Sequence, residues 1–159
     1  MKPRVVTTPV TTPVLDAQPA ERGDRRLASL LATGFAVVTV FQLCLAAGVP
    51  WGAAAWGGAD PGQLSAELRV ASGFAACFWL LAALTALARG GIAASPVPYA
   101  FSRRGTWALT ALLAVGAVMN GASQSRWERF GWAPIVFGLA VLSLQLSRSG
   151  QSGSTRMTP

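Results

Sequence analysis

Six polar residues that could take part in chemistry lie in two of the segments that connect apolar stretches of this chain. They are Asp60, Glu67, Arg69, Asn120, Glu128 and Arg129. A carboxylate beside a guanidinium forms a charge-assisted pair, and such a pair can frame a polar ligand. If the second and fourth apolar segments adjoin, Arg69 can pair with Glu128. We predict an outer polar mouth built from Arg69, Asn120, Glu128 and Arg129, with helix capping and ion pairing as the alternative role of these residues.

The residue inventory argues against metal and acid–base chemistry. The chain has no histidine, and Cys44 and Cys77 are its two cysteines. A zinc site takes about four ligands, mainly of these types, so we predict no metal site and no cofactor. Without histidine, general acid–base work would fall mainly on Glu128, Glu67 or Asp60, and none has an evident activating partner. We expect no enzymatic activity and no catalytic residues, and we expect both cysteines to be buried rather than joined in a disulfide.

The charge content is that of a membrane protein. Of the 159 residues, 52% are hydrophobic and 12% are charged, whereas a soluble domain carries about 25% charged residues. The formal net charge is +7, which could indicate nucleic-acid binding. The basic residues instead lie at the ends of apolar runs, as topology determinants do. We therefore predict a lipid bilayer, and no nucleic acid, as the partner of this chain.

Four apolar segments are candidates for membrane spans. They cover about residues 27–49, 70–88, 105–121 and 130–147, against the roughly 20 residues that cross a bilayer. The first is longer than a signal peptide's apolar region and lies further from the N-terminus. Each segment is apolar on all sides, whereas a soluble bundle helix has a polar face. The segments predict an all-α integral membrane four-helix bundle, up-down-up-down, with short interfacial segments in the outer loops.

Arginine counting sets the predicted orientation. Residues 1–26 and 148–159 are polar and are predicted to be disordered tails. The tails and the loop between spans two and three hold most arginines, whereas the other two loops hold Arg69, Arg126 and Arg129. The positive-inside rule then places both termini in the cytoplasm and residues 27–147 in the plasma membrane.

The stretch that follows the first span is rich in tryptophan, glycine and proline. It reads PWGAAAWGGADPG over residues 50–62, which favours an irregular loop over one flat helix. We predict that tryptophans of the two outer loops anchor the protein at the membrane surface; these are Trp51, Trp56, Trp127 and Trp132. Asp60 is predicted to cap a helix that begins near Pro61.

The third loop carries a second helix start. Ser125 and Glu128 have the spacing of a capping box. A helix that starts there reaches Pro134 after about two turns, where the proline ring clashes with the carbonyl of residue i−4. We expect a short interfacial helix, then a bend, then the fourth span.

Two motifs carry a family resemblance. The first is G-x-P-W-G followed by W-G-G, at residues 48–52 and 56–58, and the second is N-x-x-S-x-S-x-x-E-R-x-x-W-x-P, at residues 120–134. With these motifs the four spans resemble a family of small four-span bacterial membrane proteins of unknown function, typical of high-GC genomes. The resemblance covers the spans and not the tails, and it implies a fold without a mechanism.

The predicted function is that of a non-enzymatic accessory, structural or binding subunit. The alternative is a small uncoupled transporter of an apolar or neutral solute, acting as a homo-oligomer. Proton-coupled carriers usually need an ionisable residue inside a span, and none lies in the four cores, whose notable polar groups include Gln42, Thr85 and Gln145. A second copy of the chain or another membrane protein is the expected protein partner.

Overall fold

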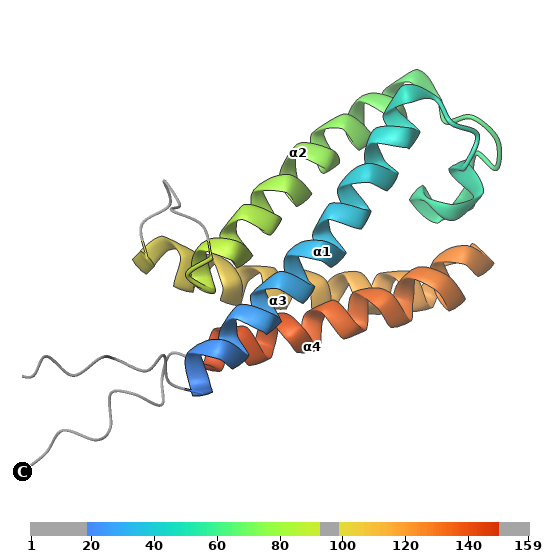
Figure 1. Cartoon of the computed structure of the whole chain (residues 1–159). Helices are drawn as coiled ribbons and strands as arrows, with labels where there is room; N and C mark the ends of the chain where they lie inside the picture. The colour runs from blue at the N-terminus through green and yellow to red at the C-terminus, as the bar shows by residue number, and fades with distance from the viewer. Residues whose placement is uncertain (1–18, 93–98, 150–159) are drawn as a thin grey trace, which may run out of the picture.

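Four long helices make up most of the chain (Figure 1). The structure is a computed structural model that describes residues 19–92 and 99–149, and those residues form helices and connecting turns. The long helices are α1 (Pro19–Ala47), α2 (Ala66–Arg89), α3 (Tyr99–Ala122) and α4 (Ala133–Ser149). Three short helical turns join them: η1 (Gly52–Ala54), η2 (Trp56–Gly58) and the π-helical η3 (Glu128–Trp132).

The long helices are suited to hydrocarbon. Residues 22–47, 66–89, 101–122 and 128–149 are each long and apolar enough to cross a membrane. Large apolar side chains such as Phe74, Val118 and Phe130 are more than 70% exposed on the outside of the bundle. Exposed apolar surface on that scale is unfavourable in water, at about 25 cal/mol per Å². The predicted all-α bundle of four helices of spanning length is confirmed.

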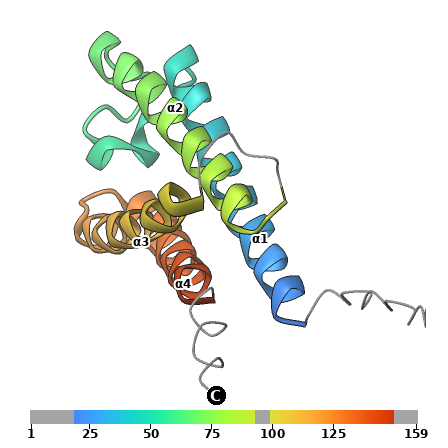
Figure 2. The ribbon, with the colours of Figure 1, turned by 90° about the vertical axis from the view of Figure 1, so that its left-hand side faces the viewer.

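The helices are arranged as two hairpins. α1 packs mainly against α2, and α3 mainly against α4, while α1–α4 and α2–α3 contacts are fewer. The hairpins meet where α1 begins and α4 ends, which we call the convergent end, and they separate toward the opposite, divergent end (Figure 1). The chain between α1 and α2 folds into this separation, beside α3 and α4 (Figure 2). The start of α1 and the end of α4 are both at the convergent end (Figure 1).

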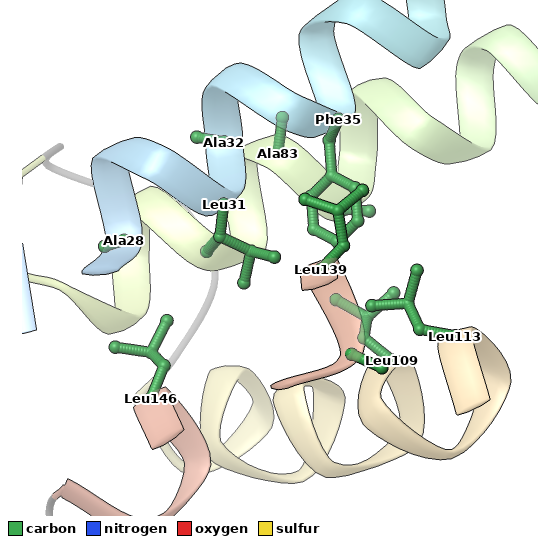
Figure 3. Close-up of a cluster of buried hydrophobic side chains, with 12 residues drawn as sticks. Ala28, Leu31, Ala32, Phe35, Ala83, Leu109, Leu113, Leu139 and Leu146 are labelled. Carbon is green, nitrogen blue, oxygen red and sulfur yellow. The ribbon is translucent and has the colours of Figure 1, made fainter. Parts of the chain in front are cut away.

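The hydrophobic core lies toward the convergent end. Phe35 and Leu31 of α1 are fully buried against Leu113 of α3 and Leu146 of α4 (Figure 3). Small residues let the helices approach closely there, because a Cβ at Gly34 would overlap the Leu139 side chain. This packing seals the space between the two hairpins.

Hydroxyl groups join α3 to α4 beside this core. Thr110 Oγ1 lies 2.8 Å from Ser143 Oγ, and Ser143 Oγ donates to the carbonyl of Thr106 at 3.2 Å. Thr106 and Ser143 are fully buried. Such interhelical hydrogen bonds contribute roughly 0.6 to 2 kcal/mol each in membranes. The two helices of this hairpin are therefore joined by polar as well as apolar contacts.

Helix boundaries differ from those expected. α1 already begins at Pro19 and α3 at Tyr99, because extending an existing helix into polar sequence costs far less than starting one. Residues 19–26 and 148–149 therefore belong to helices and not to disordered tails. The other tail residues, 1–18 and 150–159, lie outside the described residues.

The predicted start of α2 near Pro61 is wrong. The helix begins at Ala66 with Ser65 as its N-cap. Asp60 caps no helix at Pro61; its Oδ2 instead accepts a bond from the amide of Ser65 at 3.3 Å. A helix does not begin at Pro61 because the carbonyls of Pro61 and Gly62 accept hydrogen bonds from the preceding turn, and because Leu64 is buried beneath the loop.

The cysteines are free, as expected, but their burial differs from the prediction. Cys44 is half-buried and Cys77 is exposed. Burial of Cys77 was expected from its small, apolar side chain, but it lies beside the exposed Phe74 and Leu81 on the outside of the bundle.

Gly34→Ile is expected to push α1 away from α4 and to destabilise the protein. Overpacking of a filled core costs typically 1–3 kcal/mol, and the added side chain has to displace Leu139. The melting temperature in detergent should fall by several degrees. Gly138→Ile is the matched control, since a Cβ at this helical glycine meets nothing within 4 Å. Equal melting temperatures of the two variants would contradict the packing described here.

Candidate functional site

The segment between α1 and α2, residues 48–65, forms a folded cap at the divergent end; we call it the cap loop. Gly48 ends α1 with a φ of 95°, a value suited to glycine. The loop then doubles back, because the amide of Gly52 donates to the carbonyl of Gly62 at 2.9 Å. Leu64 and Ala55 bury their side chains against Leu45 of α1. The cap loop thus has its own small core and a paired backbone.

Three consecutive residues of the cap loop have a left-handed backbone. The φ angles are 53° at Trp56, 76° at Gly57 and 73° at Gly58. For a residue with a Cβ such as Trp56 this conformation costs roughly 1–2 kcal/mol. The Trp56 indole compensates in part, since its Nε1 donates to Ser72 Oγ of α2 at 3.1 Å. The loop therefore holds Trp56 in one orientation against its own hairpin.

Three hydrogen bonds fasten the cap loop to the opposite hairpin. The amide of Gly57 donates to Glu128 Oε1 at 2.9 Å. Ser125 Oγ donates to the carbonyl of Ala53 at 2.6 Å, and Trp132 Nε1 donates to the carbonyl of Ala54 at 3.0 Å. Irregular backbone near hydrocarbon needs such partners, because lipid offers none. The cap loop is consequently bound to both hairpins.

Of the two hydrogen bonds in the predicted capping box, one is formed. Ser125 Oγ accepts the amide of Glu128 at 3.3 Å, as expected. The Glu128 carboxylate does not return to the Ser125 amide, which donates to Ser123 Oγ instead. It reaches the cap loop, 71 residues away in sequence, through Gly57.

A π-helical turn replaces the expected bend before the fourth span. Helix continues from η3 into α4, and the amide of Ala133 donates to the carbonyl of Glu128. This i to i−5 pattern lengthens the turn that precedes Pro134, so the proline ring is accommodated without a break. The expectation of a separate interfacial helix is therefore wrong. π-helical turns occur frequently at functional sites, and Glu128 is the first residue of this one.

A cavity of about 190 Å³ lies beneath the cap loop, between the two hairpins. Its aromatic lining consists of Phe41, Trp56, Trp79 and Trp132. Leu113 and Leu139 belong to both the cavity wall and the hydrophobic core. The core therefore closes the cavity toward the convergent end.

Three polar side chains line this cavity. They are Gln42 of α1, Asn120 of α3 and Glu128 of η3. Asn120 Nδ2 donates to the carbonyl of Gly116, within its own helix. Gln42 Oε1 is buried and accepts no hydrogen bond within the described residues, which costs roughly 1–3 kcal/mol for a buried acceptor. Glu128 is 8% exposed. The cavity wall thus includes a buried acceptor without a protein partner in the described residues and a buried carboxylate.

The structure brings together two of the four residues predicted to form the outer mouth. Asn120 and Glu128 both line the cavity. Arg69 lies elsewhere, with its Nε donating to the carbonyl of Ala46 at 3.1 Å. Arg129 is exposed, and its Nη2 donates to the carbonyl of Ser123 at 2.7 Å. Arg69 and Glu128 form no ion pair in the described part of the chain, because each is engaged with a different backbone group.

The tryptophans predicted as anchors have different positions. Trp51, Trp56 and Trp127 are each more than 40% exposed, as surface anchors would be. Trp56 and Trp132 line the cavity and donate hydrogen bonds within the protein. Trp79 was not predicted at the site, and its one sequence signal was its isolated position within a span.

An apolar groove on the outside adjoins the cavity. Phe41, Ala54 and Trp132 line both, and the exposed Trp51 and Trp127 complete the groove with neighbouring residues. The Phe41 ring lies 6.2 Å from that of Trp51 and 4.8 Å from that of Trp132, between ring centroids. A thin aromatic wall therefore separates the cavity from the face that lipid would cover.

Gly52→Ala is expected to disrupt the cap loop. A Cβ at this position would overlap the backbone carbonyl of Asp60, which cannot move aside as a flexible side chain can. A loss of about 2 kcal/mol or more corresponds to a fall of about 4–8 °C in melting temperature for a chain of this size. Gly62→Ala is the matched control, because a Cβ there meets nothing within 4 Å. An unchanged melting temperature of Gly52→Ala would contradict the described loop.

Comparisons with protein-family models, with curated proteins and with solved structures find no match to this chain. The resemblance to a four-span bacterial family therefore rests on its two motifs and stays a prediction. The chemistry of the capped cavity is the main guide to function.

Proposed function

We propose that this chain is a non-enzymatic, multi-pass protein of the plasma membrane that binds a small ligand from the outer side. The capped cavity is the binding site. The cap loop faces outward, and both chain termini lie in the cytoplasm. The proposal depends on one observation: polar acceptors are confined beneath a folded loop, between helices of spanning length.

The distribution of arginines supports this orientation. The arginines in or beside the convergent ends of the helices are Arg22, Arg25, Arg26, Arg89, Arg103, Arg104 and Arg148. The divergent end has Arg69, Arg126 and Arg129. The positive-inside rule assigns the arginine-rich end to the cytoplasm.

The composition of the cavity wall supports binding rather than catalysis. Glu128 is the one residue of the cavity wall with an ionisable side chain. General acid–base or nucleophilic mechanisms usually need a second group that activates the first. The cavity wall does supply hydrogen-bond acceptors and aromatic surface, which are the usual means of holding a small molecule.

Transport of a neutral solute has less support. The core that includes Phe35, Leu113 and Leu139 fills the space between the cavity and the convergent end. A solute would need the two hairpins to separate along that core. Binding needs no such rearrangement.

Cysteine labelling tests the orientation. In a chain with Cys44→Ser and Cys77→Ala, a cysteine at the exposed cap-loop residue Ala59 should react with a membrane-impermeant maleimide in intact cells. A cysteine at exposed Arg103, beside the convergent end of α3, should react after the cells are opened. The reverse pattern would contradict the orientation.

A cavity-filling variant tests the binding site. Val136 lines the cavity, so Val136→Phe should abolish stabilisation by any ligand that binds there. At 100 times its dissociation constant a ligand stabilises a protein by about 2.7 kcal/mol. Among small water-soluble amines, amides and alcohols, some should raise the melting temperature of the purified wild-type protein by at least about 4 °C.

Val118→Phe is the matched control for this test, since Val118 is 71% exposed on α3. It should respond to the same compounds as the wild-type protein does. A panel that leaves the wild-type protein unchanged, or that stabilises Val136→Phe equally, would show that the cavity is not a ligand site.

A further inference from the structure

We propose that the ligand of the capped cavity is a small organic cation whose ammonium group lies between the Glu128 carboxylate and the tryptophan rings. The inference rests on the proposed binding function and names its ligand class. It depends on the charge, the aromatic lining and the size of the cavity.

The charge balance of the cavity is negative. Glu128 carries the one charged side chain among the lining residues. Within the described residues, its carboxylate has one partner, the Gly57 amide on Oε1. The Glu128 residue is 8% exposed, and a buried carboxylate is costly unless it is paired. One neutral amide and the positive end of its own helix compensate the charge in part. A cationic ligand supplies the missing opposite charge.

The aromatic lining suits a cation better than an anion. Trp56, Trp79 and Trp132 come from the cap loop, α2 and η3. An ammonium group within about 6 Å of a ring centroid is attracted by the negative face of the ring, by roughly 0.5 to 2 kcal/mol as its exposure to water decreases. Trp56 and Trp132 already donate their Nε1 hydrogens to protein acceptors. Their orientations are therefore fixed before a ligand arrives.

The size and the remaining polar group limit the ligand further. A cavity of about 150 Å³ holds benzene, so one of about 190 Å³ holds a compact ion of roughly that size or slightly larger. Gln42 Oε1 is a buried acceptor without a partner in the described residues. It suits a hydroxyl or N–H donor on the same ligand. Choline and ethanolammonium have this combination of ammonium and hydroxyl groups.

The same ammonium chemistry has two sources. A free amine can enter from the outer aqueous side beneath the cap loop. A lipid headgroup can also enter past the Phe41 and Trp132 wall, with its acyl chain in the adjoining apolar groove. Both sources place the same cationic group beside Glu128.

Calorimetry on the full chain tests the ligand class. The protein is placed in nanodiscs of phosphatidylglycerol, whose headgroup has no ammonium group. It is titrated with choline chloride or with dimethylbutanol, the uncharged isostere of choline in which a carbon atom replaces the nitrogen. Choline is expected to bind saturably and at least ten-fold more tightly than the isostere. Sodium chloride at the same concentration is expected to produce no saturable heat.

Two pairs of variants identify the groups responsible. Glu128→Gln keeps an oxygen for the Gly57 amide, so it should retain the wild-type melting temperature while it binds choline at least ten-fold more weakly. Glu67→Gln changes an exposed acid at the start of α2 and should bind choline within two-fold of wild type. Trp79→Leu should weaken choline binding by five-fold or more, and Trp79→Phe by less.

Several outcomes would overturn the proposal. Equal losses of choline affinity in Glu128→Gln and Glu67→Gln would show that choline binding depends only on general surface charge. Saturable binding of dimethylbutanol without choline binding would overturn the cationic ligand and leave the proposed binding function standing. Absence of binding by choline and by every compound of the thermal-shift panel would overturn both.

A comparison of choline affinity in two lipids identifies the source of the ammonium group. In nanodiscs of phosphatidylcholine, a lipid headgroup that occupies the cavity competes with soluble choline and weakens its apparent affinity at least ten-fold. Affinity unchanged from that in phosphatidylglycerol identifies a water-soluble amine as the ligand.

Discussion

The hydrogen bond from Gly57 to Glu128 joins the cap loop to the hairpin opposite, and the divergent end depends on it. Irregular backbone beside hydrocarbon is stable only when the protein satisfies its amides and carbonyls. Ser125 and Trp132 supply the other two links to the same loop. Glu128, Ser125 and Trp132 all lie within the nine residues before Pro134, so one short stretch of the chain anchors the loop.

The two ends of the bundle are held by different interactions. At the convergent end, close helix packing around Phe35 and the buried hydroxyls of α3 and α4 fill the interior. At the divergent end the hairpins separate, and a loop with mostly polar links fills the interval (Figure 1). Because a loop packs less completely than a helix, the cavity lies under the loop and not within the core. Its polar residues thus lie where the protein has left space.

The four helices were predictable because apolar runs of spanning length are a strong local signal. The Ser125 cap was predictable for the same reason, since capping depends on residues three apart. The site was only half predictable. Asn120 and Glu128 were expected near each other, but the partner of Glu128 lies 71 residues away and is a backbone amide, which no side-chain pattern reveals. The sequence allowed an Arg69–Glu128 pair, and the loop fold separates the two residues.

The contact between Gly34 and Leu139 lies between the sealed end of the bundle and the cap loop. α1 and α4 touch at this contact and diverge beyond it, so the two hairpins separate from this point toward the divergent end. The cavity wall includes Gln42 and Trp79 from one hairpin and Asn120 and Glu128 from the other. Because both hairpins contribute to this wall, the width of the cavity is fixed by the distance between the hairpins at the divergent end.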